Sequence, residues 1–129
     1  MSRQLVSSGR PWERIVGYSR AVRAGNMVFV GGTAASAPDG STYAPGDAYA
    51  QAKRCFDIVE EALAEAGAKL SDVVRTRMFV TDISRWQEFG RAHAERFAQI
   101  RPGLTMVEVR ALLDPEMLVE VEVDAVIEG

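Results

Sequence analysis

Carboxylate side chains recur at every second position near the end of the chain. Glu120, Glu122 and Asp124 alternate with valines at 119, 121 and 123. A period of two is typical of a β-strand with one apolar and one polar face, so the three carboxylates are predicted to share a face. Carboxylates act as general acids and bases in many enzymes. Such a row is either solvated, or it meets opposite charges and a ligand.

Two arginines follow the same spacing in an earlier segment. Arg75 and Arg77 fall on one face of a predicted strand over 73–80. Arg77 has two interpretations. It could provide a cationic contact for a ligand, or it could form an ion pair with Glu120 or Glu122 across a barrel formed by several subunits. We expect the ion pair, which would fix the register of the assembly more than it adds stability.

The remaining reactive side chains are predicted to be structural. His93, the only histidine, lies at helical spacing with Phe89 and Phe97, which places it at a helix–sheet boundary. Cys55 lies in an apolar helical stripe and is expected in the core; as the single cysteine it excludes an intrachain disulfide. No group of residues has metal-ligand spacing, and no glycine-rich phosphate loop is present, so neither a metal nor a cofactor is expected.

The elements that position these residues are read from periodicity. The predicted strands are 18–23, 27–33, 73–80, 105–110 and 118–127, and the predicted helices are 47–66 and 84–100. Residues 24–26 form a hairpin turn between the first two strands. Asp47 caps the first helix, and Ser84 with Gln87 has the spacing of a capping box for the second. The segment 6–16 is predicted to be irregular.

This order, ββαβαββ, predicts an α+β domain with two helices on one face of a sheet. Strand parity assigns a mixture of apolar and charged side chains to the other face. Its predicted apolar members are Met27, Phe29, Phe79, Leu104 and Met106. Such a face is too apolar to stay wet and too charged for a simple core. We therefore expect oligomerisation, with the sheets of several subunits facing each other.

Size and charge limit the possible classes of protein. The chain has 129 residues, which suits one domain spanning 1–129. It carries 15 Lys+Arg against 18 Asp+Glu, a net charge of −3, and no basic run, so nucleic acid is not expected as a partner. The first twenty residues lack the apolar stretch of a secretory signal, and no segment is long enough to span a membrane. A cytoplasmic location is expected.

Five segments together resemble a known family. They are YSRAVRAGN at 18–26, VFVGG at 28–32, AGA at 66–68, DVVRT at 72–76 and LVEVE at 118–122. In order and spacing they resemble the RidA/YjgF family of reactive intermediate deaminases, also labelled L-PSP endoribonucleases. The resemblance implies a chorismate-mutase-like fold, a homotrimer around a central barrel of sheets, no cofactor, and small-molecule clefts between neighbouring subunits.

The resemblance also implies roles for particular residues. Members of the family hydrolyse imines and enamines, such as 2-aminoacrylate, to keto acids and ammonia. Glu120 matches the glutamate that positions a water and handles its proton, and Tyr18 matches a tyrosine that lines the cleft. The backbone at Gly31 and Gly32 matches the segment beside the pocket. Thr105 is a further candidate for a ligand contact.

One expected residue is absent. The deaminases carry a Pro-Ala-Arg-Ser motif whose arginine binds the substrate carboxylate, but this chain reads Pro-Gly-Leu-Thr at 102–105. Leu104 therefore stands at the arginine position, and Arg77 is the candidate for a displaced cationic site. Two functions stay open: a hydrolase of imines or enamines, and a non-catalytic trimer that binds small metabolites or acts as a holdase. Endoribonuclease activity ranks last because the chain is acidic and has no histidine pair.

Overall fold

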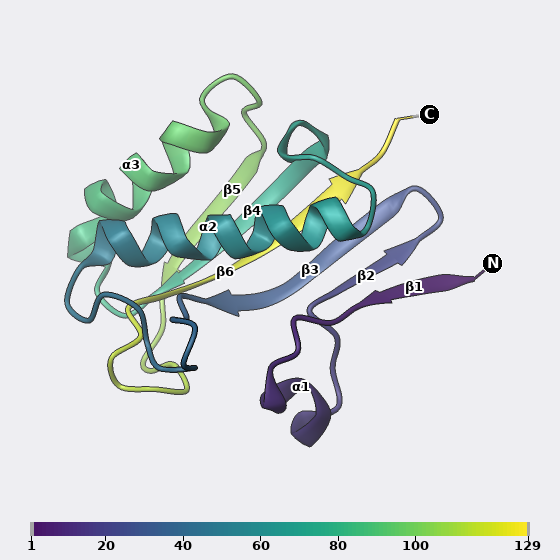
Figure 1. Cartoon of the computed structure of the whole chain (residues 1–129). Helices are drawn as coiled ribbons and strands as arrows, with labels where there is room; N and C mark the ends of the chain where they lie inside the picture. The colour runs from purple at the N-terminus through teal and green to yellow at the C-terminus, as the bar shows by residue number, and fades with distance from the viewer. Residues whose placement is uncertain (1, 129) are drawn as a thin grey trace.

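A six-stranded sheet with two long helices across one face forms the protein (Figure 1). The computed structural model describes residues 2–128, so Met1 and Gly129 of the expected domain lie outside the described residues. The elements are β1 (Arg3–Val6), α1 (Pro11–Val16), β2 (Ala21–Ala24), β3 (Met27–Ala34), α2 (Ala48–Glu65), β4 (Val73–Val80), α3 (Trp86–Phe97), β5 (Gly103–Glu108) and β6 (Val119–Val126), with short 3-10 turns at Leu70–Asp72 and Ile83–Arg85. From β2 onward this is the predicted ββαβαββ order, and the α+β class is confirmed.

The strands lie in the spatial order β1-β2-β3-β6-β4-β5. Every neighbouring pair is antiparallel except β4 and β5, which are parallel. A parallel pair needs a crossover connection, and α3 provides it. The β2–β3 hairpin turns at Gly25, whose φ of +62° is a conformation that glycine adopts readily.

Helix α2 begins and ends where the sequence predicts. The Asp47 carboxylate accepts a hydrogen bond from the Ala50 amide at 2.9 Å, which satisfies one of the free N–H groups of the first turn. Gly67, with a φ of +86°, ends the helix and lets the Ala68 amide donate to the Leu63 carbonyl at 2.8 Å. The apolar stripe of this helix is fully buried and includes Cys55, whose thiol pKa is raised by that burial.

The predicted capping box of α3 is wrong. The helix begins at Trp86, and Ser84 lies in the preceding 3-10 turn. There the Asp82 carboxylate accepts hydrogen bonds from the amide of Ser84 at 3.0 Å and from its hydroxyl at 2.5 Å. Ser84 is therefore bonded to Asp82 and does not cap the helix, although it has the capping-box spacing to Gln87.

His93 lies at the helix–sheet boundary as expected, 2.8 Å from the Thr76 hydroxyl and packed on Phe97.

The N-terminal segment is not irregular, contrary to the prediction. It forms β1, which pairs with β2, and the six-residue helix α1. Pro11 suits the first turn of α1, where its missing N–H is not needed. The buried Glu13 carboxylate accepts hydrogen bonds from the Ser7 hydroxyl at 2.9 Å and from the Ser8 amide at 3.1 Å. These contacts tie α1 to the residues that follow β1.

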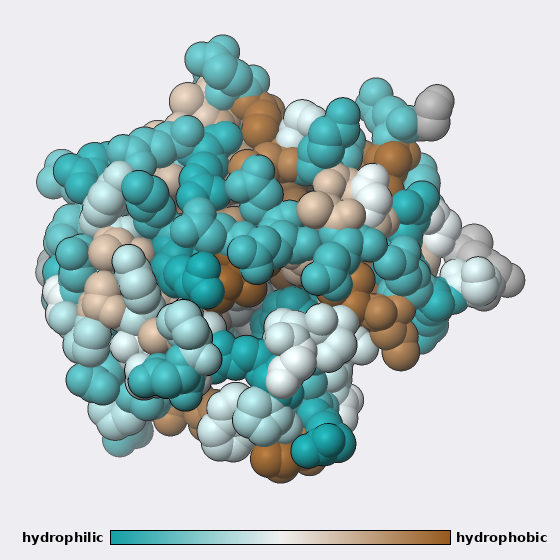
Figure 2. All heavy atoms as spheres, viewed as in Figure 1, coloured by the Kyte–Doolittle hydropathy of each residue, from teal (hydrophilic) through white to brown (hydrophobic). Residues whose placement is uncertain are grey.

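The face of the sheet opposite the helices carries the predicted charges. In β6 the valines are buried while Glu120, Glu122 and Asp124 are half-buried on the other side, so the predicted alternation is confirmed. Met27 and Phe29 are each 40% exposed. Figure 2 shows the opposite, helix-bearing side, where hydrophilic side chains dominate and hydrophobic ones lie in smaller groups between them.

Two residues assigned to the open face lie on the other one. Leu104 is paired with the buried Thr76, and Met106 with the buried Met78, so both share the helix-covered side of β5. Alternation within β5 puts Leu104 and Met106 on one face but does not say which face that is, and the register with β4 decides it. None of the helices within residues 2–128 combines the length and the apolarity needed to cross a membrane.

Candidate functional site

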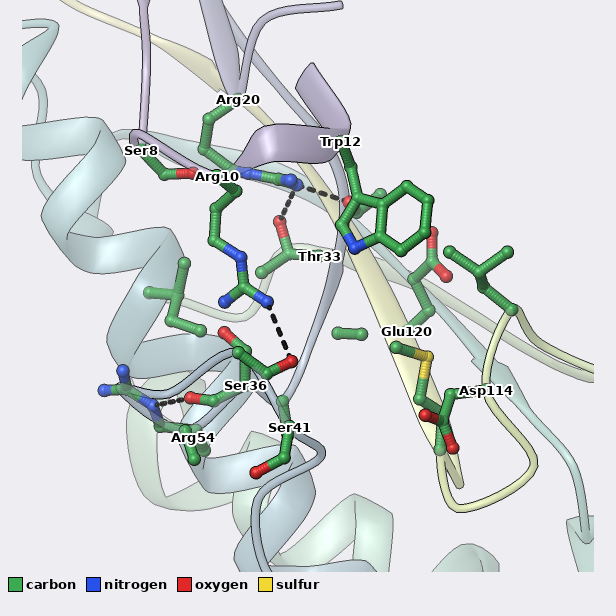
Figure 3. Close-up of a pocket in the computed structure, with 18 of the residues that line it drawn as sticks. Ser8, Arg10, Trp12, Arg20, Thr33, Ser36, Ser41, Arg54, Asp114 and Glu120 are labelled. Carbon is green, nitrogen blue, oxygen red and sulfur yellow. Dashed lines mark hydrogen bonds between the residues drawn. The ribbon is translucent and has the colours of Figure 1, made fainter. Parts of the chain in front are cut away.

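A cavity of about 710 Å³ opens beside the second half of β3 (Figure 3). Strand β2 pairs with β3 as far as Val30, and the Gly31 amide still donates to the Arg20 carbonyl at 2.9 Å, so β2 leaves residues 32 to 34 of β3 unpaired. The cavity walls come from the segment before β2, from β3, from α2 and from the β5–β6 connection. In the space-filling view the surface is hollowed between the helical layer and the segment around α1 (Figure 2).

Glu120 enters this cavity from β6 through a β-bulge in β3. The register passes from Val30–Val123 to Thr33–Val121, so Gly31 and Gly32 together face one residue of β6. A Cβ atom built on Gly32 would lie 2.0 Å from Oε2 of Glu120. A glycine at 32 is therefore what allows the carboxylate to lie against the strand.

A buried arginine that the sequence analysis missed fixes the other side of the bulge. Arg20 donates hydrogen bonds from Nη1 to the Gly32 carbonyl and, at 3.1 Å, to the Thr33 hydroxyl. Its Nη2 lies 3.4 Å from the Tyr18 hydroxyl, and its guanidinium lies over the Tyr18 ring, 5.4 Å from the centroid. The one feature of the sequence that pointed to Arg20 was its position as a charged residue in the YSRAV motif at 18–22. A fixed cation therefore lies near Glu120.

Burial and neighbouring charges set the protonation of Glu120. Burial raises the pKa of this carboxyl group, the Arg20 charge lowers it in part, and the Glu122 charge raises it, so that the net shift is upward. A carboxyl group with a raised pKa in a cavity is suited to accept and return a proton.

Two further arginines line the cavity away from the bulge. Arg10 extends into it from the side opposite Glu120, and its Nη2 lies 3.4 Å from the Gly40 carbonyl (Figure 3). Arg54 of α2 donates from Nε to the Ser36 carbonyl at 2.9 Å. Neither residue was a candidate from the sequence, because no local pattern brings position 10 next to position 54.

A buried glutamine, also missed, supports the floor of the site. Gln51 is fully buried in α2; its amide nitrogen donates to the carbonyls of Glu116 at 3.0 Å and Ala44 at 3.3 Å. Its amide oxygen accepts from the Leu118 amide at 2.9 Å. These bonds attach the connection before β6, which contributes Met117 to the cavity, to the helix. A polar residue inside an apolar stripe was the signal for it.

The structure brings together some of the residues predicted for the site and separates others. Tyr18, Gly32 and Glu120 line the cavity, and Gly31 lies in the same bulge. Arg77 lies on the open sheet face, where its Nη1 is 3.4 Å from both a Glu122 oxygen and an Asp124 oxygen. Arg77 thus forms an ion pair with the expected Glu122 and also with Asp124, but within one chain, between the neighbouring strands β4 and β6.

Leu104 and Thr105 do not line this cavity. Both lie in β5, the strand at the opposite edge of the sheet from β1. Within residues 2–128, His, Cys, Asp and Glu side chains form no group of three that could hold a metal ion.

Comparison with known proteins identifies the family. The model of the family named endoribonuclease L-PSP matches residues 10–127. An uncharacterized protein of Streptomyces coelicolor is 42% identical over 120 residues, which cover 93% of this chain and 89% of that protein. The 3-aminoacrylate deaminase RutC of Acinetobacter baylyi is 30% identical over 104 residues, covering 81% of this chain and 82% of the deaminase.

Solved structures agree with this assignment. Rv2704 of Mycobacterium tuberculosis, a member of the YjgF/YER057c/UK114 family, superimposes with a TM-score of 0.89 at 52% identity, covering 98% of this chain and 100% of that one. The YjgF gene product of E. coli gives a TM-score of 0.84 at 27% identity, covering 97% of this chain and 99% of that one. The chain belongs to the RidA/YjgF family.

Proposed function

We propose that the protein binds a small reactive metabolite in the cavity around Glu120 and hydrolyses imines or enamines to a carbonyl compound and ammonia. The observation that carries the proposal is the half-buried Glu120 carboxyl group, which lies against Gly32 and has a raised pKa. The similarity to a relative named 3-aminoacrylate deaminase supports the same reaction class.

The reaction needs one group that both accepts and donates a proton. The imine enters protonated on nitrogen. Glu120 accepts a proton from water while the water oxygen bonds to the imine carbon, which gives a neutral carbinolamine. The protonated Glu120 then returns its proton to the nitrogen, the C–N bond breaks and ammonia leaves, and the Glu120 carboxylate takes the hydroxyl proton as the carbonyl forms and releases it to solvent. An enamine enters the same sequence after protonation at carbon converts it to the imine.

The neighbours of Glu120 support this role. The Arg20 guanidinium is held by Gly32 and Thr33, so a fixed positive charge favours the ionised carboxylate that must accept the proton. The Tyr18 hydroxyl, 3.4 Å from Arg20, provides a polar group at the same wall of the cavity. Tyr18 is therefore assigned to orient the substrate.

We also propose that the protein works as a cytoplasmic homotrimer with the open sheet faces turned inward. The partly exposed Met27 and Phe29, beside the charges of Arg77 and Glu122, make a face that a second copy can cover. Leu104 and Thr105 would then reach the cleft of a neighbouring copy. A buried free cysteine suits a reducing compartment.

Light scattering tests the assembly. We expect a mass of three times 14.1 kDa for the unmodified chain. Phe29→Glu should release single chains, whereas Ala64→Glu, on the exposed side of α2, should leave the trimer intact. A particle with the mass of one chain at micromolar concentration would refute the trimer.

The reaction is tested with 2-iminobutanoate, generated from threonine by a dehydratase. We expect faster release of the keto acid than in buffer. Glu120→Gln should abolish the acceleration. Glu122→Gln removes the same charge two residues further along β6, on the same face of the strand, and should retain it. Release at the buffer rate with the unmodified protein would exclude this reaction class.

The second candidate is a non-catalytic metabolite-binding trimer. Leu104 favours it, because the deaminases hold an arginine at this position. In that case ligands raise the melting temperature according to RT ln(1 + [L]/Kd) without turnover. Cleavage of RNA has the least support, since the net charge is −3; a single-turnover assay on labelled RNA with Glu120→Ala as control tests it.

A further inference from the structure

The cavity around Glu120 is lined by positive and negative side chains in equal number. The arginines are Arg10, Arg20 and Arg54, and the carboxylates are Glu61, Asp114 and Glu120. A lining whose charges balance favours neither an anionic nor a cationic ligand by its overall field. An acid group on a ligand therefore gains no general electrostatic advantage in this cavity.

Several hydroxyl groups of the lining are already bonded within the protein. The Ser8 hydroxyl donates to the Glu13 carboxylate, and the Ser41 hydroxyl donates to the Asp39 carboxylate at 2.6 Å. The Thr33 hydroxyl donates to the carbonyl two residues before it at 2.8 Å. Because a hydroxyl group has a single proton to donate, these three have none left for a ligand.

Large apolar side chains make up another part of the cavity wall. Trp12 comes from α1, Ile58 from α2, and Leu113 and Met117 from the β5–β6 connection. Trp12 is 44% exposed and Leu113 is 71% exposed, so apolar surface is available for a ligand to cover. Covering such surface is the main source of affinity in small-molecule sites.

Trp12 is the large apolar residue on the Glu120 side of the cavity. Figure 3 shows its indole and the Glu120 carboxyl group on one side, whereas Arg10 and Arg54 extend into the cavity from the other. The neighbouring Glu13 is buried and bonded to two serines, which fixes the backbone that carries the indole. A substituent on a carbon that reacts at Glu120 is therefore placed to contact the indole, which offers a large apolar surface.

We propose that Trp12 determines the specificity of the site by holding an apolar substituent of the ligand, such as a phenyl group, beside Glu120. The protein then selects its ligand by the size of this substituent and not by an acid group. The orientation of the reactive carbon towards Glu120 rests on the proposed function, whereas the preference for an apolar substituent does not.

Four ketones that differ in two groups test the assignment by binding without turnover. The neutral pair is 2-butanone and 4-phenyl-2-butanone, and the acidic pair is 2-oxobutanoate and 2-oxo-4-phenylbutanoate, each titrated by calorimetry or NMR. We expect the phenyl group to lower Kd about tenfold in both pairs, because the ring covers apolar surface of Trp12. Exchange of the methyl group for a carboxylate should change Kd by less than about threefold.

Variants of the two tryptophans locate the effect. Trp12→Ala should reduce the gain from the phenyl group to less than about threefold, whereas Trp12→Phe keeps an aromatic ring and should retain most of it. The matched control is Trp86→Ala, at an exposed position of α3 outside this cavity, which should retain the full gain. Light scattering of Trp12→Ala should give the mass of the unmodified protein.

Four binding results would overturn the assignment. They are no gain from the phenyl group in the unmodified protein, an undiminished gain in Trp12→Ala, an equal loss in Trp86→Ala, and a carboxylate that lowers Kd about tenfold or more. A changed mass of Trp12→Ala would overturn it as well, because the indole would then contact a neighbouring copy.

Kinetics separate the role of Trp12 from the proposed function. If hydrolysis of 2-iminobutanoate depends on Glu120 but Trp12→Ala keeps the gain from the phenyl group, only the Trp12 assignment fails. If Trp12 controls that gain but Glu120→Gln hydrolyses 2-iminobutanoate as the unmodified protein does, only the proposed function fails.

Discussion

The carboxylate of Glu120 occupies the space that a side chain on Gly32 would need. A Cβ atom on Gly32 would lie 2.0 Å from Oε2 and 3.1 Å from Cδ of Glu120. The adjacent Gly31 is different, because a Cβ there would meet only backbone oxygens at 3.6 Å or more, which is ordinary contact. Two neighbouring glycines in one bulge thus have unequal importance for the site.

This difference predicts unequal effects of two matched substitutions. Gly32→Ala should push the Glu120 carboxylate away and lower kcat/KM by about 100-fold, since a displacement of about 1 Å costs that much at a catalytic group. Gly31→Ala should change it less than about threefold, because ordinary contacts cost little. Initial rates on 2-iminobutanoate measure both. Equal losses in the two variants would contradict the role of Gly32.

The pH dependence of the reaction is expected to follow Glu120. Burial raises the pKa of this carboxyl group above its ordinary 4.5, and only the ionised form can accept a proton from water. The rate should therefore rise with pH through a midpoint above 4.5. Arg20→Gln removes a charge that lowers this pKa and should move the midpoint up, whereas Glu122→Gln should move it down.

The control for this pH profile is Arg20→Lys, which keeps the positive charge but changes the shape of the side chain. Its pH midpoint should lie close to that of the unmodified protein, even where the rate itself stays low. A plot of kcat/KM against pH for the four proteins measures the shifts. Midpoints that move in the same direction for Arg20→Gln and Glu122→Gln would rule out the assignment of the titration to Glu120.

Arg77 is predicted to be dispensable for ligand binding. Its guanidinium lies 3.4 Å from oxygens of Glu122 and Asp124 and does not line the cavity. Because these side chains are 23–37% exposed, Arg77→Gln should cost less than about 1 kcal/mol of the free energy of unfolding. Its Kd for 2-oxobutanoate, the keto acid that the proposed reaction releases, should stay within about twofold of the unmodified value. A loss of about tenfold or more would return Arg77 to the site.

Gln51 is predicted to matter for stability. Gln51→Leu would leave the carbonyls of Ala44 and Glu116 and the amide of Leu118 without their partner, and it should cost about 2–3 kcal/mol in urea unfolding. The matched control is Gln87→Leu on the exposed side of α3, which should change stability by less than about 0.5 kcal/mol. Similar values for both variants would refute a structural role for the buried amide.

Local patterns gave correct predictions where a single hydrophobic period fixed the faces of a strand, or where a single side chain fixed the end of a helix. The alternation in β6 placed Glu120 on the open face, and Asp47 and Gly67 marked the ends of α2. The same method failed where a neighbouring side chain or a pairing strand decided the outcome. At Ser84 the Asp82 carboxylate accepted the hydrogen bonds, and in β5 the register with β4 placed Leu104 and Met106 on the helix-covered face.

The sequence alone determined the family and the order of strands and helices from β2 onward, and it predicted the glutamate of the candidate site, because each depends on residue types at short, regular spacing. Only the tertiary structure placed Arg20 beside Gly32, Arg10 inside the cavity and Gln51 beneath it. Those positions depend on where β2 stops along β3 and on how α1 is anchored by Glu13. Such long-range contacts have no periodic trace in the chain, since packing between distant segments decides them.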